Sequence, residues 1–305
     1  MENTYYANGK LLLTAEYFVL DGAIALACPT KFGQSLAILP SNSLYFTWKS
    51  FNSDGSMWFE GYFDKLNFNY ISSNDIAVGK MLEKILKTIL ELRATPPQYI
   101  TDFSIETHLS FPREWGLGTS STLIYNISKL FNVNPFLLLE KTFGGSGYDI
   151  ACAGADSAIL FNRKNNIPTR ENVEFKPFFT QNLYFIYLGH KQNSREGIAL
   201  YKKHRDTEGV IIDAISDLTI AFLQASDIEI LNKIIIEHEN IVQSIINLPR
   251  AKDVYFSDYW GEIKSLGAWG GDFVLATSDR NEAETIHYFH QKGFSTVLTY
   301  DEIIL

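Results

Sequence analysis

The sequence of 305 residues has few cysteines and an excess of acidic side chains. Its two cysteines, Cys28 and Cys152, are too few for a disulfide framework or a cysteine-based zinc site, which favours a reducing compartment. The 26 Lys and Arg residues against 35 Asp and Glu give a net charge of −9. A chain this acidic has no overall attraction to nucleic acid or to an anionic membrane, so we expect no nucleic-acid partner.

Long hydrophobic runs are also absent. No apolar stretch approaches the ~20 residues that span a bilayer, and the first eight residues are not typical of a secretory signal. We therefore expect a soluble, cytoplasmic protein without a membrane partner. Hydrophobic residues make up 46% and charged residues 20%, a composition typical of a folded chain that is long enough for two domains.

Strand and helix patterns alternate along both halves of the chain. Residues 43–48 and 57–62 alternate apolar and polar side chains around an Asn-Ser-Asp-Gly turn, which predicts a hairpin. Residues 75–93 carry an apolar stripe at helical spacing. Further helices are expected at 119–131, 135–143, 195–203, 209–225, 228–247 and 281–292, and further strands at 103–108, 158–161, 183–188, 273–276 and 295–298. These patterns predict an α+β or α/β protein, with the aperiodic polar stretch 162–172 as the best candidate for a domain boundary.

The middle one of three glycine clusters carries the clearest chemical signal. A strand pattern leads into this segment and an apolar helix pattern leads out of it. Its residues are Gly116, Leu117, Gly118, Thr119, Ser120 and Ser121. Glycines let backbone N–H groups approach a ligand and a helix N-terminus adds partial positive charge, so the segment suits a phosphate chain, although a capped loop without a ligand is the alternative. One hydroxyl could also reach Mg²⁺, and the Walker A pattern of P-loop proteins is absent.

Charged residues accompany the other two clusters. Lys10 follows Gly9 and could reach a transferring phosphoryl group, with Glu16 on the far flank of the same apolar run. Asp149 follows a glycine-rich turn and could act as a base, as a charge partner for Lys10, or as a helix cap, while Glu140 on the preceding helix could face a metal. The third cluster comprises Gly267, Ala268, Trp269, Gly270, Gly271 and Asp272 before a strand, and it permits close approach of a ligand or of the other domain.

In this order and at this spacing, the three clusters resemble those of the GHMP kinase superfamily, over most of the chain from Gly9 to Ala276. The resemblance implies an α+β fold of two domains: residues 1–165 as an ATP-binding domain like ribosomal protein S5 domain 2, and residues 166–305 as a ferredoxin-like domain. It implies Mg-ATP as the phosphoryl donor and a small-molecule phosphoryl acceptor, and it leaves a homodimer open. By motif match, Lys10 and Asp149 would be catalytic, the middle cluster would hold the phosphates, and Ser120 would face Mg²⁺. Glu16 and the third cluster would belong to the substrate site.

Within the superfamily the details look most like phosphomevalonate kinase. The segments that show this resemblance are Glu16-Tyr17, Gly145-Ser146-Gly147-Tyr148-Asp149 and Gly270-Gly271-Asp272. The Gly-Tyr-Asp-Ile-Ala string also resembles that of a shorter bacterial branch of GHMP kinases found beside mevalonate-pathway enzymes. The resemblance therefore implies phosphorylation of 5-phosphomevalonate in isoprenoid biosynthesis. The alternatives are a mevalonate kinase, another GHMP kinase acting on a hydroxyl, and an inactive nucleotide-binding regulator. Trp269 departs from the family's usual glycine, and we expect it to narrow the acceptor pocket.

Overall fold

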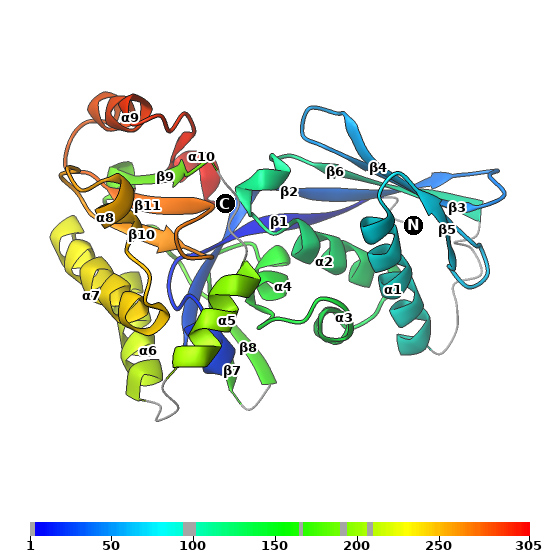
Figure 1. The fold of residues 1–305 in the computed structure, drawn as a ribbon, viewed down its shortest axis with the longest axis horizontal. Helices are drawn as coiled ribbons and strands as arrows, with labels where there is room; N and C mark the ends of the chain where they lie inside the picture. Colours follow the sequence, from blue (N-terminus) through cyan, green and yellow to red (C-terminus); the bar gives the residue numbers. More distant parts are fainter. Residues whose placement is uncertain (1–3, 94–101, 165–166, 190–193, 206–209) are drawn as a thin grey trace. The chain divides into compact units, whose positions relative to one another are not determined.

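The structure is a computed structural model that describes residues 4–93, 102–164, 167–189, 194–205 and 210–305. Figure 1 shows its mixed helices and strands in chain order. The chain forms two compact units, each built from three separate segments of the sequence. Unit 1 comprises Met1–Gly9, Phe32–Arg113 and Leu117–Gly154. Unit 2 comprises Lys10–Lys31, Glu114–Gly116 and Ala155–Leu305. The division into functional domains at residues 165 and 166 stays a prediction.

Two long strands run through both units, β1 (Thr4–Leu12) and β2 (Ala25–Pro40), and they pair with each other. In unit 1 the strand order is β5-β4-β3-β6-β2, in which β3 and β6 are parallel and the other pairs are antiparallel. The remaining elements of this unit are β3 (Phe46–Phe51), β4 (Met57–Phe63), β5 (Tyr70–Ser73), β6 (Phe103–Leu109), α1 (Ile76–Leu92), α2 (Thr119–Phe131), α3 (Pro135–Thr142) and α4 (Tyr148–Ala153).

Helices α1, α2 and α3 cover one face of the unit 1 sheet (Figure 1). Alternate residues of the strands, among them Phe46, Trp48 and Phe59, are fully buried against apolar helix residues such as Leu86 and Ile127. The side chain of Asp75 accepts a hydrogen bond from the Val78 N–H and so caps α1. The first turn of α2, at Thr119, belongs to the middle glycine cluster.

Unit 2 contains a second sheet, which is antiparallel and has the strand order β10-β11-β9-β12. In addition, residues 25–27 of β2 pair with β7, and β7 forms a hairpin with β8. Its strands are β7 (Ile159–Lys164), β8 (Ile167–Asn172), β9 (Leu183–Tyr187), β10 (Ile263–Leu266), β11 (Phe273–Thr277) and β12 (Val297–Thr299). Its helices are α5 (Ser194–His204), α6 (Val210–Leu223), α7 (Ile228–Ile246), α8 (Ala251–Tyr255), α9 (Glu282–Gln291) and α10 (Tyr300–Ile303). Helix α7 packs against α6 and β10.

Most predicted elements are confirmed within a few residues, and the differences have physical reasons. The stretch 162–172 was expected to be aperiodic, but its described residues form part of the β7–β8 hairpin, and its role as a domain boundary stays a prediction. Strand β10 was not predicted, because a buried lysine at position 264 interrupts its apolar pattern. Among the described residues, no helix combines the length and the apolar character that crossing a membrane requires.

Candidate active site

Lys10 lies near the end of β1, and its ammonium group donates a hydrogen bond to the carbonyl oxygen of Gly116 at 2.9 Å. Both residues belong to unit 2. The carboxylate of Asp272 lies directly against Gly116, since a Cβ added there would meet Asp272 Oδ2 at 2.2 Å. Gly116 also has a φ of +67°, so this position requires glycine for both space and backbone conformation. The structure thus brings together the predicted catalytic lysine, the start of the middle cluster and the end of the third.

Helix α2 begins at Thr119, within the middle cluster. Its N-cap is Gly118, whose φ of 96° is left-handed and which has no side chain to occupy the first N–H groups of the helix. Ser120 is exposed on this first turn, and Thr119 is half-buried. Leu117 is fully buried and anchors the turn, while the Ser121 hydroxyl is buried and donates to the Gly118 carbonyl. The turn therefore offers backbone N–H groups and the Ser120 hydroxyl to an anion.

Asp149 and Glu140, the two other acidic candidates, lie in unit 1. Asp149 is on the first turn of α4, half-buried, and its Oδ1 accepts a hydrogen bond from the Ile150 N–H at 3.0 Å. Glu140 lies on the exposed face of α3. In the described parts of the chain, no three His, Cys, Asp or Glu side chains gather as a metal-binding group. The donors present fit Mg²⁺ held by one or two protein oxygens together with substrate phosphates.

The third cluster forms the turn between β10 and β11. Gly267 and Gly270 have positive φ angles, and the Gly271 N–H donates to the Ala268 carbonyl. Asp272 is also left-handed, with a φ of 53°, and its carbonyl accepts from the Leu188 N–H at 2.8 Å. These bonds fix the turn whose last side chain contacts Gly116.

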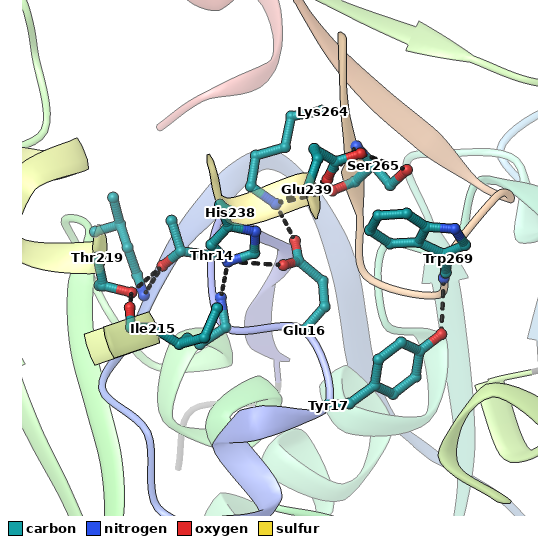
Figure 2. Close-up of polar contacts among 12 residues, drawn as sticks. Thr14, Glu16, Tyr17, Ile215, Thr219, His238, Glu239, Lys264, Ser265 and Trp269 are labelled. Atoms are coloured by element: carbon teal, nitrogen blue, oxygen red, sulfur yellow. Dashed lines mark hydrogen bonds and ion pairs between the residues drawn. The ribbon is translucent and has the colours of Figure 1, made fainter. Parts of the chain in front are cut away.

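Glu16 is fully buried. Its Oε1 accepts a hydrogen bond from Lys264 Nζ at 2.8 Å, and its Oε2 lies 3.5 Å from His238 Nε2 (Figure 2). Glu239 Oε1 lies 3.7 Å from the same lysine ammonium. We call these four side chains the buried charge cluster. Its place in the substrate site, which the motif match implied for Glu16, stays a prediction.

Burial controls the protonation of this cluster. Removal from water raises the pKa of Glu16, although the Lys264 ammonium acts in the opposite direction. Burial, with the nearby Glu16 carboxylate, raises the pKa of Glu239 to about 8, while Lys264 and hydrogen bonds from Ser265 oppose it. Burial and the Lys264 charge hold the pKa of His238 well below its usual range, so this imidazole is neutral.

Comparison with solved structures gives matches along nearly the whole chain. Methanococcus jannaschii mevalonate kinase is 17% identical with a TM-score of 0.69, and the match covers 97% of this chain and 96% of that one. Streptococcus pneumoniae phosphomevalonate kinase in complex with phosphomevalonate and AMPPNP is 15% identical with a TM-score of 0.70, covering 97% and 99%. Lactococcus lactis galactokinase complexed with galactose is 11% identical with a TM-score of 0.64, covering 98% and 93%. The chain has the GHMP kinase fold.

The α+β class and the GHMP kinase fold predicted from the sequence are thus confirmed. No protein-family model and no curated protein sequence matches the chain. The Trp269 indole is 2% exposed and its Nε1 donates to the Pro249 carbonyl at 2.8 Å, so the side chain packs inside unit 2, and its effect on the acceptor pocket stays a prediction. Its backbone N–H donates to the Tyr17 hydroxyl at 2.8 Å.

Three residues of the buried charge cluster escaped the sequence prediction. His238 occupies the apolar stripe of α7 with Leu231, Ile235 and Val242, a signal that is available in the sequence but more typical of a core position. Lys264 lies in an otherwise apolar strand just before the third cluster. The sequence analysis named its partner, Glu16, as a candidate residue but did not name Lys264.

Proposed function

We propose that this protein is a Mg-ATP-dependent small-molecule kinase that phosphorylates 5-phosphomevalonate. The observation that carries the proposal is the hydrogen bond from Lys10 to Gly116, which places an ammonium group on the glycine turn that precedes α2. The full-length likeness to mevalonate kinases, a phosphomevalonate kinase and a galactokinase supports a kinase. The motif details given above favour the phosphorylated acid as acceptor.

Phosphoryl transfer depends mainly on positioning and on neutralising charge. In this proposal the N–H groups at the start of α2 bind the nucleotide phosphates, and Lys10 stabilises charge that develops on the transferring group. Ser120 would hold Mg²⁺, with Glu140 as a second candidate, and the metal would supply further positive charge at the phosphates. ATP and Mg²⁺ are therefore the donor and cofactor that we assign.

The role of Asp149 depends on the acceptor. A phosphate monoester has a second pKa of about 6, so it is already ionised near neutral pH and needs no strong base. A hydroxyl acceptor must lose a proton during the transfer, and Asp149 would then be the candidate general base. The two assignments predict different effects of Asp149→Asn on the pH profile of turnover.

The deciding experiment measures ADP release from Mg-ATP with 5-phosphomevalonate, with mevalonate and with galactose in separate reactions. We expect turnover with 5-phosphomevalonate alone. Turnover with mevalonate or galactose alone would contradict the proposed acceptor and assign Asp149 as the base. No turnover, together with thermal stabilisation by ATP, would instead favour the nucleotide-binding regulator. The Lys10→Met variant is the control that ties any ADP release to this site.

A further inference from the structure

The segment that follows β1 holds two residues in costly backbone conformations. Ala15 has a φ of 64° and Tyr17 a φ of 65°, and neither is a glycine. A left-handed conformation costs an ordinary residue about 1–2 kcal/mol, so such residues persist only where neighbouring groups hold them. Residues 13–17 begin three positions after Lys10, and the contacts that hold them therefore also bear on the lysine.

His238 holds the first of these residues. Its Nε2 accepts a hydrogen bond from the Ala15 N–H at 2.9 Å, and the imidazole is fully buried (Figure 2). A neutral imidazole has one acceptor nitrogen, so this bond assigns the proton to Nδ1. A protonated imidazole would have no acceptor for Ala15, which is why the lowered pKa of His238 matters to the backbone conformation.

Lys264 and Trp269 hold the second half of the segment. Lys264 donates to the Glu16 carboxylate and to the Ser265 carbonyl, with no exposed surface on either charged side chain. The Tyr17 hydroxyl accepts from the Trp269 backbone N–H. Both contacts come from β10 and from the third glycine cluster, which ends at the Asp272 side chain on Gly116.

The contacts form a closed path within unit 2. It runs from Lys10 along the chain to Ala15 and Glu16, across the buried charge cluster to Lys264, and along the chain to Asp272. At both ends it reaches Gly116, through the Lys10 ammonium and through the Asp272 carboxylate. We propose that His238 and Lys264 are positioning residues for Lys10, which hold residues 13–17 in their strained conformation and so keep the ammonium group on the glycine turn. This inference depends on the proposed kinase function only for the predicted fall in kcat.

The test uses paired substitutions of His238 in the full chain. His238→Leu removes the acceptor for the Ala15 N–H, whereas His238→Gln offers an amide oxygen at a similar reach. His287→Leu is the matched control, because His287 is exposed on α9 of the same unit. Lys264→Met is a second variant, although it leaves two buried carboxyl groups without their cation and is expected to be strongly destabilising.

Two readouts do not require kinase activity. The first is hydrogen–deuterium exchange of peptides that cover residues 10–17, with α1 peptides as the reference. The second is acetylation of Lys10 by acetic anhydride, followed by mass spectrometry. In His238→Leu we expect exchange and acetylation to rise at least about tenfold at residues 10–17 without a change in α1, and we expect His238→Gln and His287→Leu to match the wild type.

The kinetic readout separates positioning from binding. A misplaced Lys10 loses contact with charge that develops in the transition state, so kcat should fall at least about tenfold while KM for ATP changes less than about threefold. Wild-type local protection in His238→Leu, or loss of protection that includes α1, would overturn the inference. If the wild type releases no ADP with any acceptor, the proposed function fails, and the exchange and acetylation results still decide whether His238 positions Lys10.

Discussion

The substitution Glu239→Gln tests the buried charge cluster through its effect on stability. Glu239 is buried beside Glu16, His238 and Lys264, and Arg250 contributes a further charge interaction from the segment after α7. Because burial raises the pKa of Glu239 from 4.5 to about 8, the folded protein holds a proton there that the unfolded chain releases above about pH 4.5. Glutamine has nearly the same shape as the protonated acid and cannot ionise.

The sign of the pH dependence follows from the raised pKa. The stabilisation from this group is fully present below the unfolded pKa of 4.5, and it is lost as the pH rises through the folded pKa of about 8. Within that window, one retained proton changes the free energy of unfolding by about 1.4 kcal/mol per pH unit. The wild type should therefore lose stability with rising pH more steeply than Glu239→Gln, by up to this slope.

The measurement is urea denaturation of both proteins at several pH values from about 5 to 8. Subtracting the two curves removes the opposite contribution of His238, whose lowered pKa adds stability as the pH rises toward its usual value. Glu237→Gln is the matched control, since Glu237 is exposed two residues earlier on α7. Parallel curves for wild type and Glu239→Gln would refute the reasoning, because Glu239 would then carry no extra proton in the folded protein.

Three further predictions concern the glycine turn, the proposed catalytic pair and the tryptophan. Gly116→Ala should reduce the free energy of unfolding more than Gly293→Ala. An alanine at either position adopts a positive φ, which costs about 1–2 kcal/mol, but only the Cβ at position 116 would also overlap a neighbouring carboxylate. Denaturation of both variants measures the difference. Lys10→Met and Asp149→Asn should each lower kcat at least about tenfold, or ~1.4 kcal/mol in barrier, in the ADP-release assay, and unchanged kcat in both folded variants would contradict the site. Trp269→Phe should lower the free energy of unfolding by about 0.5–1.5 kcal/mol by removing the hydrogen bond to the Pro249 carbonyl, without altering acceptor preference, which denaturation and competition between acceptors would measure.

Local patterns were sufficient to predict most of the fold. The hairpin of β3 and β4 and the helices α1 and α7 follow from periodicity and caps, because each buries one face whose residues recur at a regular spacing. Strand β10 was missed because Lys264 is buried by an ion pair with a residue 248 positions earlier. No short window of sequence contains that partner, so the strand looks polar when read alone.

The glycine clusters could be recognised from short stretches of sequence, whereas the contacts between these clusters could not. Glycine spacing predicted the turn at Gly116 and Gly118, and the structure assigns both positive φ. It did not predict that the Asp272 carboxylate excludes a side chain at Gly116, since that contact joins turns more than 150 positions apart. His238 shows a different gap in the sequence prediction. Its place on the apolar stripe of α7 correctly predicts a core residue, but the pattern does not reveal that its imidazole accepts a hydrogen bond from the Ala15 N–H.

Trp269 shows that the fold itself can accommodate the volume added by a departure from a motif. A tryptophan in place of glycine adds a large side chain, and on sequence grounds the added volume is assigned to the ligand pocket. Here the indole is turned into unit 2 and bonded to Pro249, while the backbone N–H is bonded to Tyr17. Tyr17 in turn lies so close to α5 that a Cβ at Gly197 would meet its hydroxyl at 2.2 Å. The indole therefore packs inside unit 2, while the backbone N–H, which a glycine at this position would also supply, joins the third cluster to the strained segment after Lys10.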